Sequence, residues 1–264
     1  MLRPRIIPCL LVHQKGLVKT VQFKAPKYVG DPINAVRIFN EKESDELMVV
    51  DIDATVLNKD PDYKMIENLA MECRMPLCYG GGIKTVDQAQ RIFALGVEKI
   101  AISSAVINNP RLITEIANRV GSQSMVVVLD IKKKLFGGYE IYTHNGTKST
   151  SIDPLEFAAK VEEFGAGELV INAIDQDGVM NGYDLQLVDR IRNVVSLPLT
   201  VLGGAGSLDD IKKLIQTHEI IGAAAGSLFV FKGVYKAVLI NYPNWNEKDQ
   251  LVNNSSINAI KHFK

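Results

Sequence analysis

Two glycine runs, each followed further along the chain by small hydroxyl residues, are the feature best suited to binding anions. Gly80-Gly81-Gly82 is followed by Ser103-Ser104, and Gly203-Gly204 is followed by Gly226-Ser227. Glycine exposes backbone N–H groups, and N–H groups at turns and helix N-termini attract phosphate oxygens. We therefore predict two phosphate cradles. Their candidate residues are Gly81, Gly82, Ser103 and Ser104 in one, and Gly203, Gly204, Gly226 and Ser227 in the other.

Three aspartates follow hydrophobic runs and could act as acids, bases or ligand-orienting groups. Asp51 and Asp130 each end such a run, and Asp177 follows another. For any one of them, capping of the next helix is an alternative role. Asp130 directly follows Met125-Val126-Val127-Val128-Leu129, where an unpaired carboxylate would be costly. Asp130 is therefore the strongest candidate for a chemical role.

A second set of charged residues stands at or near the starts of the predicted strands. It contains Arg5, Glu46, Lys99 and Glu168. Two cations and two anions at one end of a barrel would form a ring around its axis. One interpretation is a structural plug of salt bridges, and the other is a gate that admits something small and polar.

The elements that must position these residues are eight apolar segments spaced about 25–30 residues apart, as repeated strand–helix units require. They are Arg5–Leu10, Glu46–Ile52, Met75–Tyr79, Lys99–Ser103, Met125–Asp130, Glu168–Ala173, Leu197–Leu202 and Ile220–Ala225. The second half repeats the first about 122 residues later, with Pro76-Leu77 returning as Pro198-Leu199. The pattern predicts an α/β fold, a single (β/α)8 TIM barrel with a twofold half-barrel repeat, over residues 1–243.

Three segments lie outside this regular pattern. The connection from His13 to Gly30 holds four lysines and suggests a mobile lid over the mouth of the barrel. The segment from Lys132 to Tyr142 contains Gly137-Gly138 and predicts a hairpin. We expect the polar tail over residues 244–264 to be partly disordered or to form a short appended helix.

Composition narrows the class of protein. The 264 residues include 30 basic and 30 acidic side chains, so bulk charge predicts neither a nucleic-acid nor a membrane partner. Three cysteines without metal-ligand spacing fit a reducing compartment, and the first residues show no signal-peptide pattern. We expect a cytoplasmic protein with no metal site and no cofactor.

Several motifs resemble those of one enzyme family. They include Arg5-Ile6-Ile7-Pro8-Cys9-Leu10, Gly80-Gly81-Gly82-Ile83, Tyr142-Thr143-His144 and Asp175-Gln176-Asp177-Gly178. Over about 240 residues the chain resembles the cyclase subunit of imidazole glycerol phosphate synthase. Phosphoribosyl isomerases share the half-barrel repeat, but the hairpin after the fifth strand and the charged ring favour the cyclase family.

The resemblance implies a glutaminase partner on the N-terminal face, with ammonia passing through the ring of Arg5, Glu46, Lys99 and Glu168. Ammonia would attack a bisphosphate ribulosyl-carboxamide nucleotide at the mouth, giving imidazole glycerol phosphate and a carboxamide ribotide. Asp130 matches one of two catalytic aspartates. The resemblance also implies substrate-binding positions at the mouth, which are Lys19, Gly82, Ser103, Ser104, Gly204, Gly226 and Ser227.

The other catalytic aspartate is replaced in this chain. The family reads proline, cysteine, leucine, aspartate, valine where this chain has Pro8-Cys9-Leu10-Leu11-Val12. Val12 is inert, and strand alternation should point His13 away from the mouth. Three further residues at the same mouth differ from the family pattern. The family has asparagine at the position of Ser103, threonine at that of Asn172 and serine at that of Leu202.

Three functions remain open from the sequence. The first is a cyclase-type lyase of histidine biosynthesis. The second is a paralogue that keeps the glutaminase and the ammonia path but supports amidination of an acetamido sugar in surface polysaccharide synthesis. The third is a binding or scaffold module without chemistry.

Overall fold

Eight parallel strands close into a barrel in the computed structural model, which describes residues 3–252. The strands are β1 (Arg5–His13), β4 (Leu47–Asp51), β5 (Leu77–Gly80), β6 (Lys99–Ile102), β7 (Met125–Lys133), β10 (Glu168–Ala173), β11 (Leu199–Leu202) and β12 (Gly222–Ala225). Neighbours in this order pair in parallel, β12 pairs with β1, and β7 with β10. The predicted TIM barrel is confirmed.

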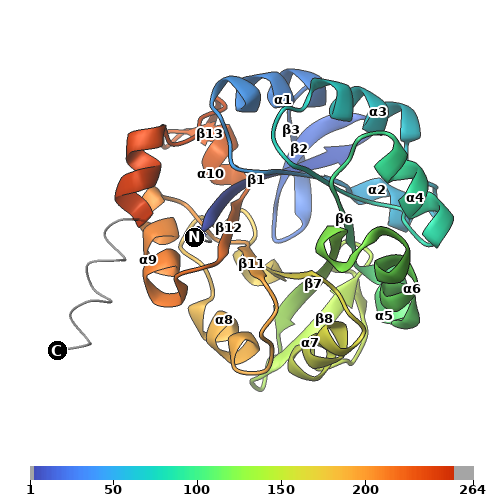
Figure 1. Cartoon of the computed structure of the whole chain (residues 1–264). Coiled ribbons are helices and arrows are strands. Elements are labelled where there is room, and N and C mark those ends of the chain that lie inside the picture. The colour runs from blue at the N-terminus through green and yellow to red at the C-terminus, as the bar shows by residue number, and fades with distance from the viewer. Residues whose placement is uncertain (1–2, 253–264) are drawn as a thin grey trace.

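Helices surround the barrel in a ring (Figure 1). The outer helices are α1 (Pro32–Glu41), α3 (Tyr63–Glu72), α4 (Val86–Ala94), α6 (Arg111–Val120), α7 (Pro154–Glu163), α8 (Leu185–Arg192) and α9 (Leu208–His218). Short helices follow four of the strands: α2 (Ile52–Val56), α5 (Ser104–Asn108), η2 (Ile174–Gln176) and α10 (Ser227–Val230), while η1 (Ser122–Ser124) precedes β7. Asp31, Thr85 and Ser207 cap α1, α4 and α9 through their side chains, which fixes where these helices begin.

The barrel has two separate apolar layers. Outward-facing strand residues and the helices form the large core, in which Phe39 and Ile66 are fully buried. A small cluster fills the barrel interior and includes Ile7, Met48 and Val170. Because the barrel strands all run in the same direction, the charged strand starts lie at one end of the barrel and the glycines at the other.

The first strand of each half-barrel runs on into an antiparallel hairpin. β1 continues into β2 (Gly16–Val21) and β3 (Lys24–Gly30), so the segment predicted as a lid is a folded β-hairpin. β7 pairs with β8 (Tyr139–Thr143), which confirms the predicted hairpin, and β8 pairs with β9 (Lys148–Ser149). The matching extensions place Leu11 of β1 and Asp130 of β7 at corresponding points, where each strand begins its antiparallel pairing, with Val18 and Tyr142 respectively.

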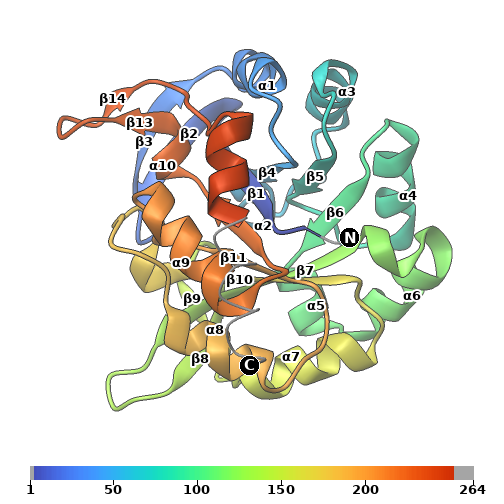
Figure 2. The ribbon, with the colours of Figure 1, turned by 60° about the vertical axis from the view of Figure 1, so that its left-hand side comes forward.

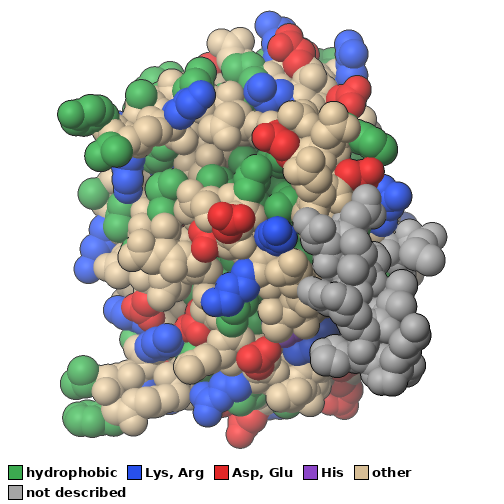
Figure 3. Space-filling view, turned by 90° about the vertical axis from the view of Figure 1, so that its left-hand side faces the viewer, with side chains coloured by type: hydrophobic (Ala, Val, Ile, Leu, Met, Phe, Trp, Pro, Cys, Tyr) green, Lys and Arg blue, Asp and Glu red, His purple; other side chains and the backbone are tan. Residues whose placement is uncertain are grey.

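A further hairpin, β13 (Phe231–Lys232) and β14 (Ala237–Val238), follows α10. It and the β7–β8 hairpin project from the body of the molecule (Figure 2). Their tips expose Leu135, Phe136, Val234 and Tyr235, and hydrophobic side chains gather at two projecting points in the space-filling view (Figure 3).

The end of the chain is described only in part. Residues 245–252 are helical, and Leu251 is buried. The rest of the segment expected to be a polar tail, residues 253–264, lies outside the described residues. Within residues 3–252, no helix has both the length and the apolar character needed to cross a membrane.

Candidate functional site

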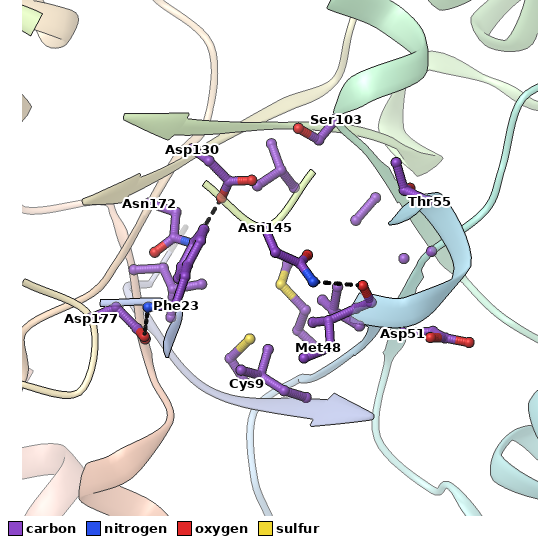
Figure 4. A pocket seen from close by; sticks show the side chains of 18 of the residues that line it. Cys9, Phe23, Met48, Asp51, Thr55, Ser103, Asp130, Asn145, Asn172 and Asp177 are labelled. Carbon is purple, nitrogen blue, oxygen red and sulfur yellow. Dashed lines mark hydrogen bonds between the residues drawn. The ribbon is translucent and has the colours of Figure 1, made fainter. Parts of the chain in front are cut away.

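A cavity of about 370 Å³ opens at the C-terminal ends of the barrel strands. It brings together every residue that the sequence assigned to the mouth, from both half-barrels. These are Lys19, Asp51, Gly81, Gly82, Ser103, Ser104, Asp130, Asn172, Asp177, Gly203, Gly204, Gly226 and Ser227. Figure 4 shows Ser103, Asp130, Asn172, Asp177 and Asp51 around this cavity, from strands on different sides of the barrel.

The two glycine runs have the backbone geometry expected of anion cradles. Gly81 and Gly82 have φ of +128° and +73°, and Gly203 and Gly204 have +95° and +114°. Side chains rarely adopt these values, and a Cβ on Gly204 would collide with the carbonyl oxygen of Gly182. The absence of side chains at these turns lets a ligand approach the backbone, where N–H groups can bind anions.

Lys19 adds a cation to the second cradle. It comes from strand β2, is 5% exposed, and donates a hydrogen bond from Nζ to the Cys9 carbonyl oxygen. A Cβ on Gly226 would collide with the same ammonium group, so Lys19 lies directly beside the backbone of that cradle. Burial lowers the pKa of Lys19 from its ordinary value, and a bound phosphate would favour the charged form.

Asp130 lines the cavity from β7 and is the carboxylate best suited to proton transfer. Its Oδ1 accepts a hydrogen bond of 2.9 Å from Nδ2 of Asn172. Burial raises the pKa of Asp130 to about 7, the Asn172 hydrogen bond opposes the rise, and the charge of Asp177 adds to it. A carboxyl group with a pKa near neutrality can both accept and return a proton at physiological pH.

The other two aspartates already have partners within the protein. Oδ1 of Asp51 accepts from the backbone N–H groups of Asp53 and Ala54, at 2.9 and 3.2 Å, and so caps α2. Asp177 accepts from the Thr20 hydroxyl at 2.7 Å and from the Phe23 N–H at 3.2 Å. Asp51 is therefore a helix cap, as the alternative role for these aspartates predicted. Asp177 holds the β2–β3 hairpin beside the mouth through its hydrogen bonds.

Leu11 faces the cavity, so position 11 supplies no acid to the mouth. Leu11, Val50 and Leu202 line the cavity as apolar groups. Val12 is buried, and Nδ1 of His13 lies 2.6 Å from Oδ1 of Asp53, outside the cavity. The expectation that His13 points away from the mouth is confirmed.

At the opposite end of the barrel the four predicted charged residues form one closed network. Nζ of Lys99 lies 2.9 Å from a carboxylate oxygen of both Glu46 and Glu168. Arg5 pairs with the same two glutamates, at 2.8 Å for Glu168. Although burial opposes it, Arg5 and Lys99 hold the pKa of Glu168 below its usual value. The ring lies on the barrel axis, below the small interior cluster.

Some residues of the cavity carry no clear signal in the sequence. Phe23 reaches the mouth from the β2–β3 hairpin, and His144 and Asn145 reach it from the turn after β8. The side chain of Asn145 donates to the Ile52 carbonyl oxygen at 2.9 Å, which joins that turn to α2. The motif Tyr142-Thr143-His144 was the one available indication that this turn belongs to the site.

Comparison with known proteins gives consistent matches along the barrel. The family described as "Histidine biosynthesis protein" matches residues 5–236. A relative from Vibrio vulnificus, named "Putative imidazole glycerol phosphate synthase subunit hisF3", is 63% identical over 94% of this chain and 96% of its own length. One from Pseudomonas aeruginosa, named "Putative imidazole glycerol phosphate synthase subunit hisF2", is 52% identical over 94% and 99%. "Imidazole glycerol phosphate synthase subunit HisF" of Natranaerobius thermophilus is 37% identical over 92% and 96%.

Proposed function

Because the chain belongs to the histidine biosynthesis protein family, as a HisF-like barrel subunit, we propose that it is the synthase subunit of a glutamine amidotransferase complex. Its substrate would be a nucleotide with a phosphate at each end, held between the two cradles. Ammonia would attack this substrate beside Asp130, and the products would be imidazole glycerol phosphate and an aminoimidazole carboxamide ribotide.

One observation supports this proposal above all others. A single cavity is lined by both glycine turns that we propose as phosphate cradles, one from each half-barrel, and by Asp130. A ligand anchored at both ends has its middle fixed relative to the carboxyl group, and such positioning is a large part of catalysis. Neither a single cradle nor a cavity without a titratable group would support the same chemistry.

The proposed source of ammonia is a glutaminase subunit docked on the N-terminal face of the barrel. Support comes from the ring of Arg5, Glu46, Lys99 and Glu168, which closes the barrel at that face and lies on the axis that leads to the cavity. A ring held by several short ion pairs can exclude water and still open when one member moves. A plug needed only for stability would be served equally well by apolar residues.

Leu11 favours a second candidate function. Position 11 offers no second proton-transfer group, and general acid–base groups typically contribute about 10²–10⁴-fold in rate. In this alternative the barrel conducts ammonia to another acceptor, in the amidination of an acetamido sugar for surface polysaccharide. The phosphate cradles would then bind a ligand without converting it.

One assay separates the two candidates. The purified chain is mixed with the phosphoribulosyl-formimino carboxamide nucleotide and an ammonium salt, and product formation is followed by absorbance. Turnover that Asp130→Asn abolishes supports the synthase. Tight binding of the nucleotide without turnover supports the ammonia-conducting alternative. Absence of both binding and turnover contradicts both.

We expect Lys99→Met to uncouple glutamine hydrolysis from ammonia use. The change keeps the aliphatic stem but leaves Glu46 and Glu168 with Arg5 as their remaining cation in the ring, so the ring should loosen. In the complex with the glutaminase, the ratio of glutamate formed to ammonia incorporated should rise several-fold. Lys64→Met, which removes an exposed Lys64–Glu67 pair on α3, should leave the ratio unchanged. An unchanged ratio in Lys99→Met would assign the ring a purely structural role.

A further inference from the structure

Two hairpins rise from the rim of the cavity, and each ends in a pair of exposed apolar side chains. The turn between β7 and β8 carries Leu135 and Phe136, which are 92% and 97% exposed. The turn between β13 and β14 carries Val234 and Tyr235, which are each 96% exposed. Single apolar residues on a surface are ordinary, but adjacent large ones at projecting tips indicate contact with something outside the chain.

Both tips lie on the face of the molecule where the cavity opens. Asp130, which lines the cavity, pairs with the start of this hairpin's return strand, β8. β13 directly follows α10, whose Ser227 also lines the cavity. The two hairpins project toward the same side in Figure 2, and two apolar points project together along one side in Figure 3. A flat surface in front of the mouth would therefore meet both tips.

The hairpins on this face carry positive charge without negative charge. The segments 16–30, 131–139 and 231–238 cover the β2–β3 hairpin, the β7–β8 turn and the β13–β14 hairpin, and they contain lysine but no aspartate or glutamate. The chain as a whole has equal numbers of basic and acidic residues, so its net charge of zero conceals this local excess. The exposed lysines of these segments are Lys24, Lys27, Lys133, Lys134, Lys232 and Lys236.

These lysines stand beside the apolar tips, and most of them have no carboxylate partner. Lys134 directly precedes Leu135, and Lys236 directly follows Tyr235. Lys133 forms an ion pair with a carboxylate oxygen at 3.0 Å. Within the part of the chain that the structure describes, the other five lysines form no ion pair. Their charge is therefore available to an anionic partner.

The arrangement fits a lipid surface better than a protein surface. The two hairpins follow β7 and β12, which are separated in the barrel by β10 and β11, so the four apolar side chains form two points instead of one continuous patch. The core of a protein interface is such a patch. A bilayer needs no matching pockets, because apolar tips enter it while lysines stay at the headgroups. Tyrosine is also frequent at the boundary between membrane and water.

We propose that this face binds reversibly to a membrane that contains anionic phospholipids. The tips of the β7–β8 and β13–β14 hairpins insert between the lipids, and the lysines beside them contact the phosphate headgroups. The mouth of the cavity then faces the membrane. This inference does not rest on the proposed function, because neither the tips nor their lysines take part in its chemistry.

The test is co-sedimentation of the purified chain with vesicles made of equal parts of phosphatidylglycerol and phosphatidylcholine. We expect binding to these vesicles, little binding to phosphatidylcholine alone, and weaker binding as added salt screens the lysines. Phe136→Ser and Tyr235→Ser should each lower the partition coefficient about tenfold, and the double variant about 100-fold, because each removes an inserted ring from a separate tip. Lys134→Gln should lower it about fivefold.

Matched substitutions elsewhere on the surface provide the controls. Met71→Ser removes a side chain that is 72% exposed, near the end of α3. Lys213→Gln removes an exposed lysine from α9. Both lie outside the hairpins and should leave the partition coefficient unchanged. The tip variants should keep the melting temperature of the wild type, because their side chains are exposed.

Each other outcome would overturn the proposal. Absence of binding to the mixed vesicles would leave docking of a protein as the role of the tips. Equal binding to both kinds of vesicle would remove the anionic lipid as the partner. Binding that neither tip variant weakens would mean that another face contacts the lipid. None of these results bears on the proposed synthase, which is judged by turnover in solution.

Discussion

Asp130→Asn is expected to reduce ammonia-dependent turnover by about 10²–10⁴-fold while leaving the affinity for the bisphosphate nucleotide nearly unchanged. Asparagine has the shape of the carboxyl group and can still accept the hydrogen bond from Nδ2 of Asn172. It cannot accept and return a proton. The measurement is single-turnover product formation at saturating ammonium salt, together with titration of the nucleotide. A variant that retains wild-type turnover would remove Asp130 from the chemistry.

The same substitution should make the fold more stable at neutral and alkaline pH. Burial raises the pKa of Asp130 from an ordinary 3.8 to about 7, so the folded chain holds a proton that the unfolded chain has released. Wild-type stability should therefore fall as pH rises from about 4 to about 7, by about 1.4 kcal/mol for each unit of pKa difference.

Thermal unfolding of the two chains at several pH values tests this expectation. Asp130→Asn should melt above the wild type at pH 8, and the difference should shrink toward pH 4. Asp153→Asn, which changes a half-buried helix cap on α7, provides a comparison without a fully buried carboxyl group. A pH-independent difference for Asp130→Asn would mean that its carboxyl group titrates normally. If Asp130→Asn both abolishes turnover and stabilises the fold at pH 8, the Asp130 carboxylate is retained for chemistry although it lowers stability.

Much of the site could be predicted because parallel barrel strands all end at one mouth. Gly81, Gly203 and Asp130 each end a recognisable apolar run, so their convergence follows from the topology alone. The charged ring could be predicted for the same reason, from the other end of the same strands.

The remaining features depend on contacts between distant segments. Phe23 lies at the mouth because Asp177 holds the β2–β3 hairpin through Thr20, and no local pattern in the sequence specifies that contact. Asn145 is held in the same way, by the carbonyl of Ile52. The hydrogen bond from Asn172 to Asp130 also depends on geometry, because only the register between β7 and β10 sets its amide against Asp130.

Leu11→Asp is the change expected to raise turnover most. The two half-barrels place residue 11 and Asp130 at corresponding points before their hairpins, so an aspartate there would face the cavity opposite Asp130. If only the second proton-transfer group is missing, turnover of the bisphosphate nucleotide should increase by about 10²-fold or more.

The new carboxyl group would stand among apolar residues such as Val50 and Leu202, so its burial should destabilise the fold and raise its own pKa. The gain should therefore grow with pH, and Leu11→Asn, equal in shape but unable to exchange a proton, should show none. A stable Leu11→Asp chain that binds the nucleotide without faster turnover would contradict the synthase proposal. In that case the ammonia-conducting function would become the better account of this barrel.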